Sequence, residues 1–166
     1  NRQRQPGIVL LDIRLTGMSG ISFFHHLNDN YPHFYWPICF VTGHGDIAMA
    51  VETVRDGAFD FLTKPFEPEK LLDVIERASK RSRKLIVAFE FISDYMARLA
   101  KLTDKELQVM KHIVQGKTNK EVSEILNNST RTIELHRSRI FEKIGVASAT
   151  ELATLAERYD NLTNGS

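Results

Sequence analysis

The sequence of 166 residues has a single cysteine, a single tryptophan and few prolines, and its 22 basic side chains nearly balance its 21 acidic ones. One cysteine, Cys39, excludes an internal disulfide and fits a reducing cytoplasm. No apolar run reaches the roughly 20 residues of a membrane-spanning helix. The start of the chain, NRQRQPG, has no apolar core of the kind found in signal peptides. These absences predict a cytoplasmic protein that contacts no membrane.

The first 66 residues contain three short apolar runs rich in β-branched and aromatic residues, at residues 8–11, 38–41 and 59–62. Residues 21–28 and 47–55, which lie between these runs, are predicted helices. Strands that alternate with helices indicate βαβ units, and nearly continuous apolar strands indicate a parallel sheet covered on both faces. This half is therefore predicted to be α/β.

The rest of the chain is predicted to be all helical. Residues 69–78 form one helix, and residues 83–100 form a helical linker. Three Ser/Thr-x-x-Glu capping boxes mark further helix starts, and one serine is expected to cap another helix without a box: Thr103, Thr118, Ser148 and Ser129. Four helices in the last third, joined by tight turns, predict a compact domain that contains a helix-turn-helix.

An aspartate, Asp12, ends the first apolar run in IVLLDIRLTGMSG, where burial without a partner would be costly. The second run ends at Thr42, and Lys64 follows the third. The carboxyl ends of parallel strands share one edge, where open α/β sheets bind ligands, so the three side chains are expected to converge there. A carboxylate can attack a phosphoryl group whose oxygens a lysine neutralises and a hydroxyl binds. The set therefore predicts an aspartyl-phosphate site.

The order and spacing of these segments resemble the receiver domain of bacterial two-component response regulators: LLDIRL, GMSG, FVTGHGD and DFLTKPF. The resemblance implies that Asp12 is the phosphoacceptor, Thr42 the switch hydroxyl and Lys64 the phosphate contact. It implies that Phe61 is the aromatic side chain that turns inward upon phosphorylation, and that a sensor histidine kinase is a partner. The implied fold is a partial flavodoxin-like, doubly wound parallel sheet, and the Lys64-Pro65 bond is expected to be cis.

The same resemblance implies a Mg²⁺ site made by Asp12, the backbone carbonyl of Arg14 and an acidic pair from a receiver's first strand. That pair would precede Asn1, as would the first strand, first helix and second strand, so a truncated receiver is expected. With Asp12 as the one carboxylate, Mg²⁺ is expected to bind weakly or not at all.

The predicted helix over residues 130–144 has one apolar and one mixed face. Ile133, Ile140 and Ile144 lie within about 40 degrees of one another on a helical wheel and form a buried stripe. On the opposite face, Leu135 could contact a thymine methyl group and Glu134 could accept from cytosine in a DNA major groove. Between residues 111 and 143, seven basic side chains outnumber four acidic ones. Geometry alone leaves two alternatives open, a DNA-binding helix and a protein-docking helix.

Residues 102–156, from LTDKEL to ELATLA, resemble without a gap the helix-turn-helix domain of the NarL/FixJ group, which LuxR-type proteins share. The resemblance implies that the last helix dimerises the DNA-bound form through Leu152 and Leu155, and therefore that the operator is two-fold. The predicted interface with double-stranded DNA comprises base contacts, phosphate contacts and one further residue of the exposed face: Glu134, Leu135 and Ser138; Asn119, Lys120, Arg131, Thr132 and Lys143; and Arg139.

Together these observations predict an α/β receiver over residues 1–82, a helical linker over 83–100 and a DNA-binding domain over 101–166. The predicted function is a homodimeric transcriptional regulator of a phosphorelay, switched at Asp12, and not an enzyme. One alternative is a DNA-binding protein that works without phosphorylation. Another is a phosphatase with an aspartate nucleophile, whose chemistry needs a second Asp where Arg14 stands.

Overall fold

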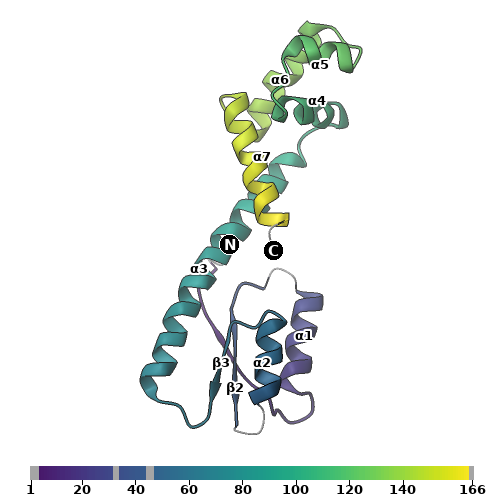
Figure 1. Ribbon diagram of the computed structural model, residues 1–166. Helices are drawn as coiled ribbons and strands as arrows, with labels where there is room; N and C mark the ends of the chain where they lie inside the picture. The colour runs from purple at the N-terminus through teal and green to yellow at the C-terminus, as the bar shows by residue number, and fades with distance from the viewer. Residues whose placement is uncertain (1–3, 32–33, 44–46, 165–166) are drawn as a thin grey trace. The chain divides into compact units, whose positions relative to one another are not determined.

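The computed structural model of the chain describes residues 4–31, 34–43 and 47–164. It forms two compact units, residues 1–89 and residues 90–166. The N-terminal unit alternates strands with helices, and the C-terminal unit is helical (Figure 1). The α/β and all-α halves predicted from the sequence are both present. Within the described residues, no helix has the length and apolarity needed to cross a membrane.

The N-terminal unit is built on a parallel sheet with strand order β1-β2-β3. The strands are β1 (Val9–Asp12), β2 (Ile38–Thr42) and β3 (Asp60–Thr63). All five residues of the central strand β2 are buried, as expected for a strand covered on both faces. β1 and β3 begin and end one residue later than the predicted apolar runs, and β2 extends one residue further than its run. The hydrogen bonds between strands join backbone groups, so they also include the polar residue that follows each run.

Helices cover both faces of this sheet. On one face α1 (Gly20–Asn30) contributes Phe24 to a cluster with Leu11 and Phe40, and α2 (Ile47–Arg55) lies beside it in Figure 1. On the other face Val74 of α3 packs against Cys39 and Leu62. The Cys39 thiol is wholly buried, and that burial raises its pKa to about 12, so it serves packing.

The helix α3 (Pro68–Leu99) is far longer than the predicted segment 69–78. It runs through the basic residues 80–84 and through almost all of the predicted linker. Lysine and arginine are good helix formers, and neither glycine nor proline interrupts residues 69–99, so no local signal ends the helix. The border between the two compact units, after Phe89, falls inside this helix.

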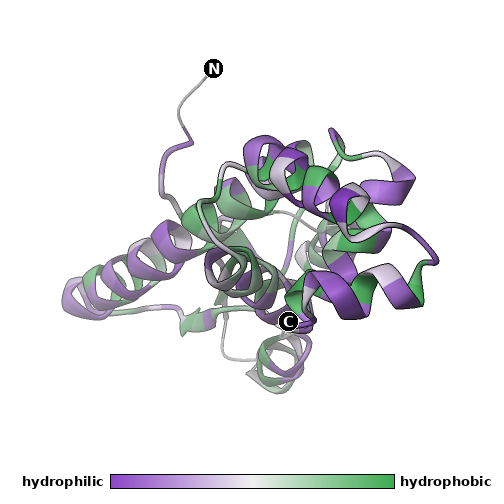
Figure 2. Ribbon diagram, turned by 90° about the horizontal axis from the view of Figure 1, so that it is seen from above, coloured by the Kyte–Doolittle hydropathy of each residue, from purple (hydrophilic) through white to green (hydrophobic). Residues whose placement is uncertain are grey.

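The C-terminal unit comprises the end of α3 and four helices: α4 (Asp104–Val114), α5 (Asn119–Ile125), α6 (Thr130–Ile144) and α7 (Ala149–Asn164). Ile133, Ile140 and Ile144 have no exposed surface, which confirms the predicted stripe. They form the core with Val122 and Leu152, among others. The helices carry hydrophobic and hydrophilic residues in alternation along their length, as amphipathic helices do (Figure 2).

Side chains cap the starts of these helices as the sequence predicted, with one difference. Thr103 and Thr118 form complete capping boxes, and Ser129 caps α6. At α7 the Ser148 hydroxyl accepts from the backbone N–H of Glu151 at 3.1 Å, but the Glu151 carboxylate accepts from Ala147, one residue before the cap. The third box is therefore shifted outward by one amide.

Glu106 joins the start of α4 to α6. The residue is 2% exposed, and its carboxylate accepts from the Thr103 backbone N–H at 2.8 Å and from the Lys143 ammonium at 2.7 Å. The hydrogen bond from Lys143, followed by that from Thr103, lowers the pKa of Glu106 from 4.5 to about 2. A carboxylate whose pKa falls on folding stabilises the protein above its unfolded pKa, and this stability is lost as the pH falls through the folded pKa.

We therefore expect Glu106→Gln to lower the free energy of unfolding of the C-terminal unit at pH 7 by about 1–3 kcal/mol. The difference from wild type should shrink as the pH falls from about 4.5 toward about 2. Urea unfolding followed by far-UV circular dichroism measures it. Glu142→Gln, at an exposed position of α6, is the matched control, and an equal loss in the two variants would contradict the assignment.

Candidate functional site

The three polar residues expected at the carboxyl edge of the sheet lie there. Asp12 and Thr42 are the last residues of β1 and β2, and Lys64 directly follows β3. The Lys64 ammonium lies 2.7 Å from Oδ2 of Asp12, although 52 residues separate them in sequence. The Lys64–Pro65 bond is cis, as predicted. The parallel register thus joins a carboxylate and an ammonium at one edge.

The Asp12 carboxylate is held from two sides. Its Oδ2 accepts from Lys64, and its Oδ1 accepts from the backbone N–H of Arg14 at 2.9 Å. The hydrogen bond from Lys64 is the main cause, and the one from Arg14 the second, of a pKa below the ordinary 3.8. With 36% of its side chain exposed, Asp12 is an ionised carboxylate that a reacting molecule can approach from solvent.

Thr42 ends β2 at the same edge, and Phe61 lies further back in β3, opposite Phe40. Thr42 is 1% exposed, and its hydroxyl donates to the Gly43 carbonyl at 3.1 Å. Phe61 is half-buried and packs against the cluster of Leu11, Phe24 and Phe40. Rotation of the Thr42 hydroxyl away from Gly43 would let it donate toward the edge, and Phe61 already borders the core.

Two glycines shape the loop after Asp12, and the role of the second, Gly20, was not predicted from the sequence. Gly17 has φ +94°, a conformation that favours glycine. At Gly20, the first residue of α1, an added Cβ would overlap the Asp12 carbonyl oxygen. The Gly20 backbone N–H donates to the Ile13 carbonyl at 3.0 Å. Only glycine lets α1 start this close to the strand that carries Asp12.

The residues described at this edge do not fit Mg²⁺ by themselves. Magnesium takes six oxygen ligands, of which one or two are usually carboxylates. Here both oxygens of Asp12 already have donors, and the described residues contain no group of three or more His, Cys, Asp or Glu side chains that could hold a metal. The Arg14 carbonyl is the other predicted ligand.

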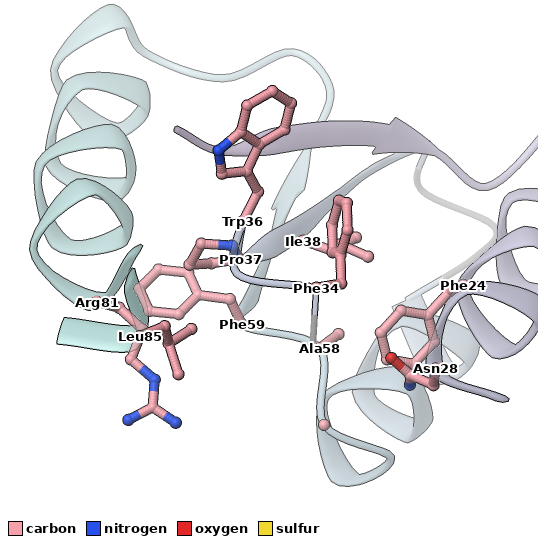
Figure 3. Close-up of a pocket in the computed structure, with 11 residues that line it drawn as sticks. Phe24, Asn28, Phe34, Trp36, Pro37, Ile38, Ala58, Phe59, Arg81 and Leu85 are labelled. Atoms are coloured by element: carbon pink, nitrogen blue, oxygen red, sulfur yellow. The ribbon is translucent and has the colours of Figure 1, made fainter. Parts of the chain in front are cut away.

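A cavity of about 370 Å³ lies at the opposite end of the sheet. It is bounded by residues at or before the starts of β2 and β3, and Figure 3 shows Phe34, Trp36 and Phe59 there, with Phe24 on α1 and Arg81 on α3. The Trp36 indole N–H already donates to the Gln5 carbonyl at 2.9 Å. The cavity is therefore separate from the edge that carries Asp12, Thr42 and Lys64, and the candidate phosphorylation site lies at that edge.

In the C-terminal unit, burial of the isoleucine stripe leaves the other face of α6 in solvent. Glu134, Leu135 and Ser138 are exposed, with Leu135 at 50%. Arg131 and Arg139 are exposed as well. This face presents a mixture of apolar, acidic, basic and hydroxyl groups, which is what reading base edges requires.

The residues predicted to contact phosphate differ in how free their polar groups are. Lys120 is exposed. The Thr132 hydroxyl shares a hydrogen bond of 2.8 Å with the Ser129 hydroxyl at the helix cap. The Lys143 ammonium donates to the Glu106 carboxylate. Asn119 accepts at 3.2 Å from Arg137, a residue that sequence reasoning did not select. The guanidinium of Arg137 lies 5.2 Å from the centroid of the Phe141 ring, one helical turn later. That spacing of a cation and an aromatic residue was the sequence signal that Arg137 is held in place.

The two leucines predicted to mediate dimerisation lie mainly inside the unit. Leu152 has no exposed surface and belongs to the core of its own chain, and Leu155 is half-buried against the same core. Leu152 therefore stabilises the fold and makes no direct contact outside it. Dimerisation through α7 stays a prediction, in which Leu155 and the exposed side chains of the helix would form the contact.

Comparisons with known proteins agree with both units. Residues 1–76 match the response regulator receiver domain family, and residues 100–156 match the luxR family of bacterial regulatory proteins. A receiver followed by a LuxR-type DNA-binding domain defines the class as a response regulator that acts on transcription. The chain belongs to the NarL/FixJ family of response regulators.

Similar proteins cover nearly the whole chain. The transcriptional regulatory protein FixJ of Bradyrhizobium diazoefficiens is 37% identical over 158 residues, which are 95% of this chain and 76% of that protein. The response regulator protein TodT of Pseudomonas putida is 36% identical over 92% of this chain and 66% of its own length. A solved structure of the response regulator StyR superposes with a TM-score of 0.76 at 36% identity, over 95% of this chain and 80% of that one.

The names of these relatives describe regulators, and they give the phosphatase alternative no support. The residue two positions after Asp12 is Arg14, where that chemistry needs a second aspartate. What the edge of the sheet supplies is one ionised carboxylate beside one ammonium.

The assignment of the low pKa of Asp12 to Lys64 has a direct test. We expect Lys64→Gln to raise the pKa of Asp12 toward the ordinary 3.8, because the principal hydrogen bond to the charged form is removed while that from Arg14 remains. The carboxyl ¹³C shift of Asp12, followed by NMR between pH 2 and pH 6, reports it. Lys70→Gln, at an exposed position of α3, is the control and should leave the titration of Asp12 unchanged. An unchanged titration of Asp12 in Lys64→Gln would contradict the assignment.

Proposed function

We propose that this chain binds double-stranded DNA as a homodimer through the exposed face of α6 (Thr130–Ile144), and that phosphorylation of Asp12 controls this binding. The observation that carries the proposal is the convergence of Asp12, Thr42 and Lys64 on one sheet edge, in the same chain as an exposed recognition helix. In this proposal the protein is cytoplasmic, where its DNA and a sensor histidine kinase are accessible.

The proposed chemistry at the edge is a phosphoryl transfer. A carboxylate oxygen of Asp12 forms a bond to phosphorus as the bond between phosphorus and the donor breaks, and the donor leaves with that electron pair. Lys64, now 2.7 Å from Oδ2, is placed to neutralise the phosphoryl oxygens, and Thr42 is placed to donate to one of them. The donor in the proposed phosphorelay is a phosphohistidine of the kinase.

The proposed consequence is dimerisation. Thr42 and Phe61 would repack when the phosphoryl group arrives, and the surface from α2 to β3 would then pair with a second copy. Three exposed apolar side chains of α2 support this surface: Met49, Val51 and Val54. Pairing two recognition helices raises the affinity for a two-fold operator, because the second half-site binds within the same complex.

The proposed DNA contacts divide between base edges and phosphates. Glu134, Leu135 and Ser138 would read bases, while Asn119, Lys120, Arg131, Thr132 and Arg139 would contact the backbone or lie next to it. Lys143 would reach a phosphate only with the donors that Glu106 does not use. A lysine has three, so the two contacts are compatible.

A second candidate is a DNA-binding protein that works without phosphorylation. One observation favours it, since the described residues supply a single carboxylate at the edge and its Oδ2 is paired with Lys64. In that case DNA affinity would not change with a phosphodonor.

The division between base and phosphate contacts can be measured. We expect Leu135→Ala and Glu134→Ala to weaken binding to a duplex that wild type selects from a random library by about 1–3 kcal/mol each, with random duplex affected less than twofold. Lys120→Ala should weaken both equally and reduce the salt slope by about one. Fluorescence anisotropy measures the affinities.

The matched control for Lys120 is Lys105→Ala, at an exposed position of α4 outside the proposed interface. Equal losses on selected and random duplexes in Leu135→Ala would contradict base reading by α6.

A further inference from the structure

The carboxyl end of the recognition helix α6 is held by a side chain from the end of α3. Arg98, in the last turn of α3, donates from Nη1 to the backbone carbonyl of Ile144, the last residue of α6, at 2.7 Å. Its Nη2 lies 2.7 Å from Oδ2 of Asp94, one turn earlier in α3. One guanidinium therefore joins the two helices across 46 residues of sequence.

This contact sits where α6 needs a partner. The last carbonyls of a helix have no partner within it and carry the negative end of its dipole, so a cation there is favourable. α6 stops at Gly145, which has φ +75°, and whose N–H donates to the Phe141 carbonyl at 2.8 Å. Because the helix ends there, the Ile144 carbonyl lies beyond the helical hydrogen-bond ladder, and it accepts from Arg98 instead.

The backbone at the contact keeps space for the guanidinium. A Cβ built on Gly145 would lie 3.1 Å from Nη1 of Arg98, so any other residue there would press on the guanidinium. Glycine at this position thus serves both the left-handed turn and the close approach of Arg98.

Apolar burial holds one face of α6 against the core. Ile133, Ile140 and Ile144 are wholly buried, and Tyr95 of α3 is buried in the same cluster. Contacts of this kind are not directional. A charge-assisted hydrogen bond to one carbonyl is directional, and it acts at one end of the helix that carries Glu134, Leu135 and Ser138.

We propose that Arg98 is a positioning residue for DNA recognition, which fixes the carboxyl end of α6 to the last turn of α3 and thereby sets how the helix enters the groove. The inference rests on the proposed DNA binding through α6. Arg98 touches no base in this account, and it acts through the orientation of the residues that do.

The experiment compares Arg98→Ala, Arg98→Gln and Arg98→Lys with wild type in the full chain. The control is Lys101→Ala, which removes an equal charge three residues later at an exposed position. Two duplexes serve as probes, one selected by wild type from a random library and one with the same composition in scrambled order. Anisotropy gives both affinities at a temperature well below the melting temperature of each variant.

The informative quantity is the ratio of the two affinities. A variant that is merely less stable loses active protein for both duplexes alike, so its ratio stays at the wild-type value. We expect Arg98→Ala to lower the ratio about tenfold, the effect of losing one charge-assisted hydrogen bond. Arg98→Gln and Arg98→Lys should lie between, since each keeps either a donor or the charge, and Lys101→Ala should match wild type.

A wild-type ratio in all three Arg98 variants would overturn the inference and leave Arg98 a role in stability alone. A selection from which wild-type protein recovers no duplex would instead overturn the proposed DNA binding, and this inference with it. The two failures are distinguishable because the second appears in the wild type.

Discussion

The parallel pairing of three short strands is the constraint on which the N-terminal unit depends. Because β1, β2 and β3 run in one direction, their carboxyl ends share one edge, and residues far apart in sequence meet there. The ion pair between Asp12 and Lys64 at 2.7 Å is the direct result. It keeps Asp12 ionised beside a cation, and Gly20 lets the following helix start against the same strand.

The C-terminal unit depends on a comparable constraint. Burying the isoleucine stripe of α6 fixes which face of the helix meets solvent, so the exposed residues Glu134, Leu135 and Ser138 are a consequence of core packing. Polar contacts then fix the ends of the helices. Ser129 caps the start of α6, Glu106 ties α4 to Lys143, and Arg98 holds the end of α6. In the proposed function, these contacts convert a packed bundle into an oriented reading surface.

Much of this could be predicted from the sequence, because the signals are local and periodic. Apolar runs predicted the strands, the 3.6-residue spacing predicted the buried stripe of α6, and Ser/Thr-x-x-Glu predicted two capping boxes in full. The convergence of Asp12 and Lys64 followed from topology. The sequence predicted two helical segments, residues 69–78 and a helical linker over 83–100, where the structure has the single helix α3. The residues between the two segments are good helix formers without a stop signal, so the helix continues through them.

Other features could not be predicted, since they depend on contacts between distant residues. The family resemblance implies that Lys143 contacts phosphate, but its ammonium meets Glu106, which lies 37 residues away in sequence. The same resemblance implies that Leu152 mediates dimerisation, yet its own chain encloses it. Nothing in the sequence near Arg98 indicates that it reaches Ile144. In each case the sequence indicates what the residue can do chemically, but it does not show which distant residue it contacts.

The central claim is that Asp12 is a phosphoacceptor, and the mass of the intact protein after incubation with acetyl phosphate, with and without Mg²⁺, tests it most directly. The account predicts an adduct of one phosphoryl group that is absent from Asp12→Asn. An unchanged mass, in protein that still binds DNA, would contradict the switch and leave a DNA-binding protein that works without phosphorylation.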